Sequence, residues 1–243
     1  MSTHLNLRTI MATAKVVEIP PPPAPQLEGS QPDLAGSDWV KADRRKRAFD
    51  LVAASLLLLL FLPAIAVIMT VLAICHPGPI FFSHTRIGRD GKPFKCLKFR
   101  SMCVNADDVL AAHLKANPDD LREWVLTQKL RHDPRILPIG SFLRKSSLDE
   151  LPQLINVLMG HMSLVGPRPI TAAEIANYGD KFCHYMSVRP GVSGLWQISG
   201  RSDTSYDERV TLDVQYARHN SIWGDVKILL RTVGVVLRGR GAY

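Results

Sequence analysis

At 243 residues the chain can form one domain of ordinary size with appendages. Its four cysteines have neither a C-x-x-C pair nor histidines at zinc-type spacing, which predicts reduced thiols in a protein that faces the cytoplasm. A formal net charge of +8 at pH 7 is typical of proteins that bind nucleic acid, anionic lipid or phosphorylated small molecules. A long uncharged apolar segment and the lack of any recognition module in the sequence exclude nucleic acid.

Residues 1–40 form a proline-rich N-terminal arm that we expect to be disordered. Pro20 to Pro23 are followed by more Pro, Gly, Ser and Ala, a composition that cannot bury enough apolar surface to fold by itself. The arm does not have the pattern of a secretory signal peptide. A polyproline tract can bind an adaptor domain, but a tether is the role that this composition favours.

Residues 41–76 combine a basic cluster with an apolar segment that predicts a membrane helix. Leu51 to Cys75 contain no charged residue, and these 25 residues span about 37 Å as a helix, more than the roughly 30 Å of a bilayer core. Lys and Arg lie on both sides of the segment, whereas a spanning helix keeps them on the cytoplasmic side. Pro63 would also kink the helix. Together these features favour a re-entrant helix that bends near Pro63; a spanning helix is the alternative.

Residues 77–243 are expected to form a mostly helical catalytic domain with a small β-hairpin. Two strands between Ile80 and Phe99 flank Gly88–Gly91, in which Asp-Gly marks a tight turn. Helical patterns occur at residues 105–130, with a break at Asn117–Pro118, and at 147–160, 171–186 and 206–220. Loops are expected around Pro138 and Gly140, at Gly166–Pro169 and at Arg189–Gly194.

The C-terminal segment Trp223–Leu237 mixes apolar and basic residues behind a leading tryptophan. This pattern is typical of a helix that lies in a membrane interface. A helix docked on the core of its own protein would have a similar sequence, so both interpretations stay open.

The stretch Ser146–Leu154 places two adjacent carboxylates, Asp149 and Glu150, at the expected start of a helix. Ser147 and Glu150 match a capping box, and Asp149 would then lie in the first turn, where free N–H groups and the helix dipole favour a charged carboxylate. For an isolated pair, a purely structural role is the simpler interpretation. The basic residues elsewhere in the chain make a catalytic role the better hypothesis.

Basic residues in short groups are candidates for phosphate binding: Lys98, Arg100, Arg144, Lys145, Arg168, Arg189 and Arg201. Arginine forks match phosphate oxygens, so several that converge on one site would suit a diphosphate substrate. A solvated surface or contact with anionic lipid is the alternative. Carboxylates beside such arginines could hold a divalent cation, or could attack phosphorus to form an acyl-phosphate. The residues thus indicate membrane-associated phosphate chemistry assisted by a metal.

Residues 44–243 resemble the bacterial sugar transferases, the monotopic polyprenyl-phosphate hexose-1-phosphate transferases. The matching motifs occur in order over most of the chain. They are Pro77–Phe82, Arg86–Gly88, Lys98–Met102, Asp133–Arg135, Leu143–Leu154, Gly166–Pro169, Arg189–Gly191 and Gly194–Gln197. Each motif is weak by itself, whereas eight in order are highly specific.

The resemblance implies transfer of hexose-1-phosphate from a UDP-sugar to polyprenyl phosphate, which starts exopolysaccharide synthesis, with galactose or glucose as the first candidates. Asp149 would attack the phosphate on the sugar, UMP would leave, and polyprenyl phosphate would then take the phospho-sugar from Asp149. Mg²⁺, with Mn²⁺ as a substitute, would be held by Asp149 and Glu150. Phosphate would be bound by Arg168, helped by Lys98, Arg100, Arg144 and Arg189.

The resemblance also implies a monotopic protein of the bacterial inner membrane, with a kinked re-entrant helix, interfacial amphipathic helices and a cytoplasmic catalytic domain. Self-association through the membrane-proximal helices is a separate expectation. Family members often have Ser before the kink proline, whereas Leu62 precedes Pro63 here, so the geometry of the kink stays open. The usual Asp-Ala of the family is replaced by Asn105-Ala106-Asp107, to which we assign no role. A non-catalytic, membrane-attached organiser with this fold is the competing hypothesis, and the intact carboxylate pair argues against it.

Overall fold

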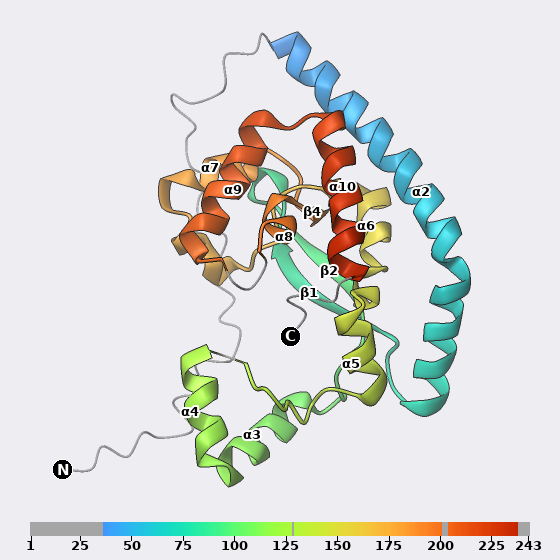
Figure 1. Ribbon diagram of the computed structural model, residues 1–243, viewed down its shortest axis with the longest axis vertical. Coiled ribbons are helices and arrows are strands. Elements are labelled where there is room, and N and C mark those ends of the chain that lie inside the picture. Colours follow the sequence, from blue (N-terminus) through green and yellow to red (C-terminus); the bar gives the residue numbers. More distant parts are fainter. Residues whose placement is uncertain (1–35, 128, 201–203, 238–243) are drawn as a thin grey trace, which may run out of the picture.

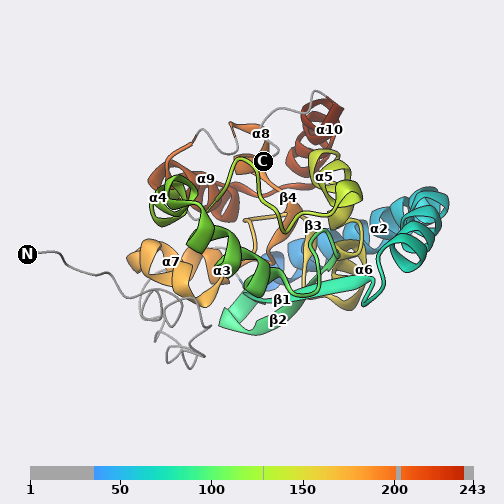
Figure 2. The ribbon, with the colours of Figure 1, turned by 90° about the horizontal axis from the view of Figure 1, so that it is seen from below.

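A computed structural model describes residues 36–127, 129–200 and 204–237 (Figure 1). It confirms a mostly helical protein with a small antiparallel β-hairpin. Most of the predicted N-terminal arm, residues 1–35, lies outside the described residues, and the first described helix begins within the arm, at Gly36. In Figures 1 and 2, the long helix α2 (Gly36–Cys75) runs along one side of the body, and α7 (Phe182–Met186) and α9 (Tyr206–His219) lie on the opposite side.

Helix α2 contains the apolar segment. It continues through Pro63, and Figure 1 shows that it bends along its length. Residues Ala42–Cys75 are long and apolar enough to cross a membrane, and only 11% of their most apolar eighteen residues are buried. Such an exposed apolar helix supports association with a membrane.

The buried residues of α2 lie on one face, on both sides of the proline. Ala54 packs in a core cluster with residues of α6 (Gln153–Met159), and Ile68 and Leu72 pack in a second cluster with Phe99 and Leu143. Both halves of α2 therefore rest on the catalytic domain.

The predicted hairpin consists of β1 (Phe81–Ile87) and β2 (Pro93–Phe99). Asp90 and Gly91 both have positive φ, at 57° and 71°, which confirms the tight Asp-Gly turn. In the antiparallel register, Phe82 lies opposite Lys98. This pairing fixes the strand that presents Lys98.

Helix α6 lies between α2 and the hairpin and contacts both (Figure 1). Its fully buried Asn156 completes the edge of β2: Leu97 N–H donates to Asn156 Oδ1 at 2.9 Å, and Asn156 Nδ2 donates to the Lys95 carbonyl at 2.8 Å. The side-chain amide thus takes the place of a neighbouring strand.

Replacing Asn156 with Ala is expected to lower the free energy of unfolding by about 2 kcal/mol, because it leaves a buried N–H and a buried carbonyl without partners. Chemical denaturation of detergent-solubilised protein measures the change. Asn220, which is exposed and bonds only within its own chain turn, provides the matched control, and Asn220→Ala should change stability by less than about 0.5 kcal/mol. Equal effects of the two variants would contradict the role given to Asn156.

Two short strands, β3 (Ser163–Val165) and β4 (Gly191–Ser193), form a parallel pair that the sequence analysis missed. The prediction of a loop throughout Arg189–Gly194 is therefore wrong, because residues 191–193 form β4. The two segments approach closely, since a Cβ atom on Gly191 would lie 2.1 Å from the Gly166 nitrogen. This contact seats the Gly166–Pro169 turn on β4.

The remaining helices support several of the predicted elements and correct others. They are α3 (Ala106–Ala116), α4 (Pro118–Thr127), α5 (Pro138–Lys145), α8 (Leu195–Ile198) and α10 (Ile222–Leu237). The predicted break at Asn117–Pro118 and the helix near 206–220 are confirmed. The helix predicted at 171–186 is wrong over its first part, which forms 3₁₀ turns at Ala172–Asn177 and Gly179–Lys181 before α7.

The loop expected around Pro138 and Gly140 is also wrong, because both residues lie in α5. Pro138 occupies the first turn, where its missing N–H costs nothing. Gly140 is present for packing, since a Cβ there would lie 2.0 Å from the Ser101 carbonyl oxygen. A glycine needed for close approach looks the same in a sequence as a glycine needed for a turn.

Helix α10 has features of both interpretations of the C-terminal segment, the helix docked on the protein core and the helix in a membrane interface. Its inner face is docked, with Asp225 and Ile228 at most 5% exposed. Its outer face presents Trp223, Leu230 and Val233, which are 76%, 69% and 58% exposed. A docked helix with an apolar outer face is suited to a protein that rests on a membrane.

Candidate active site

Asp149 and Glu150 lie on a 3₁₀ turn, Leu148–Glu150, between α5 and α6. The predicted capping box is wrong: Ser147 is in the left-handed region with φ of 56°, its side chain makes no capping hydrogen bond, and α6 begins only at Gln153. The Ser146 hydroxyl bonds the carbonyls at the end of α5. The carboxylate of Glu150 is therefore available for a tertiary contact.

The turn is supported from below by the apolar helix. Leu148 and Leu151, which flank the two carboxylates, pack against the core cluster that contains Ile68 and Leu72 of α2. The position of the carboxylate pair is thus tied to the helix that associates with the membrane.

Lys98 of β2 joins the two carboxylates. Its Nζ lies 2.6 Å from Glu150 Oε1 and 3.7 Å from Asp149 Oδ2. Burial acts to lower the pKa of Lys98, but the charges of Glu150 and Asp149 outweigh it and raise that pKa. Lys98 is therefore held as a cation beside the pair.

Asp149 is buried, with 8% of its surface exposed. Burial raises the pKa of its carboxyl above the usual 3.8, Lys98 and Arg144 act to lower it, and Glu150 adds to the rise. We expected the N-terminus of a helix to keep Asp149 charged, but Asp149 lies on a 3₁₀ turn and α6 begins only at Gln153. The ionisation of Asp149 depends on the neighbouring cations.

Arg144 and Arg168 also lie close to the pair. Arg144 Nε donates to Ser101 Oγ at 2.9 Å, and Arg144 and Asp149 shift each other's pKa. Burial lowers the pKa of Arg168, while Glu150 is among the carboxylates near enough to raise it. Lys98 therefore contacts both carboxylates, while Arg144 is near enough to act on Asp149 through its charge and Glu150 is near enough to act on Arg168. Phosphate binding by these three residues stays a prediction.

The structure brings the predicted Arg100 and Arg189 to different places, whereas Arg201 lies outside the described residues. Arg100, only 6% exposed, donates to the His76 and Pro77 carbonyls at the end of α2. Arg189 donates to Asp43 Oδ1 at 2.9 Å and to the Gly160 carbonyl at 3.2 Å. Both arginines connect the chain to the ends of helices rather than to the carboxylate pair.

Residues 41–239 match the family model described as bacterial sugar transferase. The chain belongs to this family. It is 50% identical over 198 residues to the UDP-galactose-lipid carrier transferase of Erwinia amylovora, a match that covers 82% of this chain and 41% of that protein. It is 48% identical over 198 residues to the exopolysaccharide production protein ExoY of Rhizobium meliloti, covering 82% and 88%.

A third relative of this sugar transferase is the UDP-glucose:undecaprenyl-phosphate glucose-1-phosphate transferase of Escherichia coli, 42% identical over 206 residues. The match covers 82% of the chain and 41% of that protein. The chain therefore spans less than half of the Erwinia and Escherichia relatives and most of the Rhizobium one.

Asp149 and Glu150 suit a magnesium site in which a substrate supplies the remaining ligands of the ion. No group of three or more His, Cys, Asp or Glu side chains that could hold a metal occurs in the described part of the chain. Mg²⁺ commonly uses one or two carboxylates together with substrate phosphates, so Asp149 and Glu150 offer a suitable donor set. Because Lys98 contacts Glu150, a bound cation would share that carboxylate with the lysine.

Sequence reasoning gave no role to several residues that lie around Arg168 of the transferase. They are Arg86, Glu174, Trp196, Arg209 and Asp213. Two local signals occur among them: Thr171 and Glu174 form a true capping box, and Arg209 and Asp213 are four residues apart on α9. Tertiary packing brings these two groups together with Arg86 and Trp196.

Proposed function

We propose that the protein transfers hexose-1-phosphate from a UDP-sugar to polyprenyl phosphate, giving polyprenyl-diphosphate-sugar and UMP, as the first membrane step of exopolysaccharide synthesis. The observation that carries this proposal is the buried Asp149 beside Glu150, with Lys98, Arg144 and Arg168 around them. The names of the relatives support the same reaction. The arrangement combines a nucleophile with cations that match a diphosphate.

In the first step an Asp149 oxygen attacks the phosphorus attached to the sugar. The bond from this phosphorus to the bridging oxygen breaks, and UMP leaves with the electron pair. Lys98 and Arg144 offset the negative charge on the phosphoryl group, and the Arg168 guanidinium donates hydrogen bonds to phosphate oxygens. A Mg²⁺ ion held by Asp149 and Glu150 would supply further charge neutralisation.

In the second step an oxygen of polyprenyl phosphate attacks the phosphorus of the phospho-sugar on Asp149. The acyl-phosphate bond breaks, the carboxylate is restored, and the new diphosphate joins the sugar to the lipid. Asp149 is thus the nucleophile of the first displacement and the leaving group of the second, which is the pattern of a ping-pong reaction.

We place the protein on the cytoplasmic face of the bacterial inner membrane, with α2 as a re-entrant helix and the outer face of α10 in the interface. Basic residues flank the apolar segment at both ends. Both halves of α2 also pack on the catalytic domain, as a helix that returns to one face requires. Residues 1–40 would then resist labelling from the periplasm, and labelling from that side would favour a spanning helix. Self-association stays a prediction.

The proposed nucleophile predicts a pH dependence for the first step. Because burial raises the pKa of Asp149, UMP release should decline with falling pH at a higher pH than an ordinary aspartate would give. Lys98→Met removes a charge that lowers this pKa, so the decline should move to still higher pH, and the plateau rate should fall by about a hundredfold.

Single-turnover UMP release without polyprenyl phosphate is the measurement, because the acceptor phosphate then contributes no ionisation. Lys95→Met is the matched control on the same strand, since Lys95 Nζ bonds Thr85 Oγ1 and is exposed. A decline that stays in place, or moves to lower pH, in Lys98→Met would contradict the role given to Lys98.

The reaction is tested by UMP release from membranes that contain the protein, with polyprenyl phosphate, Mg²⁺ and a panel of UDP-sugars. We expect release with UDP-galactose or UDP-glucose, and loss of release after chelation. The donor that works identifies the sugar. The absence of UMP release with every donor would instead support the non-catalytic organiser.

A further inference from the structure

Two arginines pack on one tryptophan, Trp196. The guanidinium carbons of Arg168 and Arg209 each lie 5.2 Å from the centroid of the Trp196 ring. Trp196 is itself fixed, because its Nε1 donates to Thr204 Oγ1 at 2.7 Å. Arg209 also lies 4.9 Å from the Tyr206 ring centroid. Each contact is a cation–π interaction, so the indole ring holds both guanidinium groups.

The buried arginine of this cluster has too few partners. Arg209 is 6% exposed, and its Nη1 reaches Glu174 at 3.4 Å while its Nε is 4.0 Å from Asp213. Its Nε and Nη2 have no hydrogen-bond acceptor among the described residues. Arg86 shares the same Glu174 at 3.4 Å. Arg86 and Arg209 thus share Glu174, and Arg168 lies near enough to Glu174 and Glu150 for both carboxylates to act on it. The two N–H groups of Arg209 without acceptors are unusual, because buried charges are normally paired.

The backbone of Arg168 is fixed on both sides. Asp213 receives a backbone hydrogen bond from Arg168 and a 2.6 Å hydrogen bond from Tyr178 OH. Arg86 Nη1 donates to the Pro169 carbonyl at 3.2 Å. Arg168 and Arg86 are partly exposed, whereas Arg209 is 6% exposed, so a ligand would reach this cluster at Arg168 or Arg86, and of these two Arg168 lies near Glu150.

We propose that Arg209 and Trp196 are positioning residues that hold the Arg168 guanidinium to bind the phosphate of the departing nucleotide. This inference rests on the proposed function. Lys98 and Arg144 lie at Asp149, where the sugar phosphate reacts, which leaves Arg168 for the second phosphate of the substrate. That phosphate would bring further negative charge to a cluster whose most buried arginine has two N–H groups without acceptors. Because the Trp196 ring already carries two guanidinium groups, it is not expected to stack on the uracil base.

The test compares the dissociation constants of UMP and uridine by calorimetry on the purified full chain. Arg209→Met should weaken UMP binding about tenfold or more and leave uridine binding unchanged, since only UMP carries the phosphate. Arg168→Met should have the same effect. Because Arg209 acts through Arg168, the double variant should bind UMP no more weakly than Arg168→Met alone.

Conservative variants separate positioning from a general loss of structure. Arg209→Lys and Trp196→Phe keep a cation and an aromatic ring, and each should lose UMP affinity by only a few-fold with uridine unchanged. Arg131→Met, at a side chain that is 86% exposed, should bind both ligands as the wild type does.

Additive losses in the double variant, equal losses for UMP and uridine, or unchanged UMP affinity in Arg209→Met would each overturn the inference. None of these results would affect the proposed reaction. Failure of the wild-type protein to bind UMP would contradict the proposed function itself.

Discussion

Replacing Asp149 with Asn is expected to reduce UMP release by about a thousandfold or more. The amide has the shape of the carboxylate but cannot act as the nucleophile, so neither displacement can occur. Lys98 keeps its 2.6 Å contact with Glu150, so the surrounding charges stay in place. The loss should therefore appear in the maximal rate, with UMP affinity changed little.

A covalent intermediate gives this prediction a second readout. Wild-type protein incubated with the donor UDP-sugar and no polyprenyl phosphate should gain the mass of a hexose phosphate on the peptide that contains Asp149, and the Asn variant should not. Glu150→Gln is the matched control, because it neutralises the neighbouring carboxylate and keeps the nucleophile. It should still form the intermediate, more slowly and at higher Mg²⁺ concentration. UMP release that survives in Asp149→Asn would exclude Asp149 as the nucleophile.

Elements with strong local signals were predictable from the sequence. The Asp-Gly pair dictates the hairpin turn because both residues tolerate positive φ, and the structure has them at 57° and 71°. Asn117–Pro118 ends α3 because proline disfavours helix in the preceding residue. In these cases short-range sterics decide the conformation.

The capping box shows where local reasoning fails. Ser147 and Glu150 have the same spacing as Ser205 and Glu208, which do form a capping box at the start of α9. At the first pair, Lys98 from a distant strand binds Glu150 instead. Nothing in the nine residues around Asp149 reports that lysine. The strands β3 and β4 were missed for another reason: at three residues each they are too short to show a period.

The sequence predicted which types of residue form the candidate site better than it predicted which particular residues come together there. The sequence analysis named Arg168 as the phosphate-binding residue and four other basic residues as its helpers. In the structure Lys98 contacts both carboxylates, Arg144 acts on Asp149 through its charge, and Glu150 acts on Arg168. Arg100 instead binds the carbonyls of His76 and Pro77, which directly follow α2, an interaction available to any arginine that packs near a helix end. The sequence identifies basic residues that are candidates for phosphate binding, and tertiary packing decides which of them lie near the carboxylates.

A buried ionic network fastens the apolar helix to the catalytic domain. Lys46 of α2 has its Nζ 2.9 Å from Asp50 Oδ1 and 2.9 Å from Asp225 Oδ2 of α10, and both aspartates are fully buried. Tyr216 OH donates to Asp225 Oδ1 at 2.9 Å, and Leu164 N–H donates to Asp50 Oδ1 at 3.2 Å. The single lysine therefore serves two carboxylates that water does not reach.

Replacing Lys46 with Met is expected to lower the free energy of unfolding by about 3–5 kcal/mol, because it leaves two buried carboxylates without their cation. Burial raises the pKa of Asp225, and Lys46 acts to lower it, so the variant raises this pKa further. Protonated aspartate needs no cation. The destabilisation caused by Lys46→Met should therefore reach its full size at high pH and should become smaller as the pH falls through the raised pKa of Asp225.

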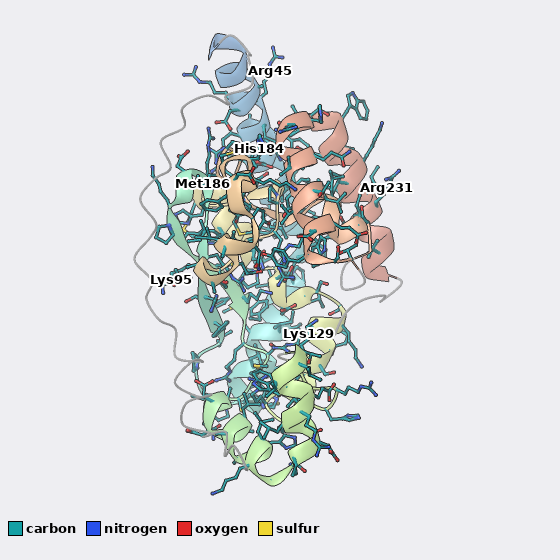
Figure 3. The ribbon with its side chains drawn as sticks, turned by 90° about the vertical axis from the view of Figure 1, so that its left-hand side faces the viewer. Arg45, Lys95, Lys129, His184, Met186 and Arg231 are labelled. Carbon is teal, nitrogen blue, oxygen red and sulfur yellow. The ribbon has the colours of Figure 1, made fainter. Side chains whose placement is uncertain are left out.

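Thermal unfolding in lipid nanodiscs across a range of pH measures the effect. Arg45→Met is the matched control, since Arg45 is exposed at the free end of the same helix (Figure 3), and it should change stability by less than about 0.5 kcal/mol. Adding Asp225→Asn to Lys46→Met should restore part of the loss by removing one buried charge. Equal stability of the Lys46 and Arg45 variants would show that the network does not hold the helix. A large effect would show that the apolar helix and the catalytic domain unfold as one unit. Lys46 would then also help to hold α2 against Leu148 and Leu151, the two residues that flank the carboxylate pair.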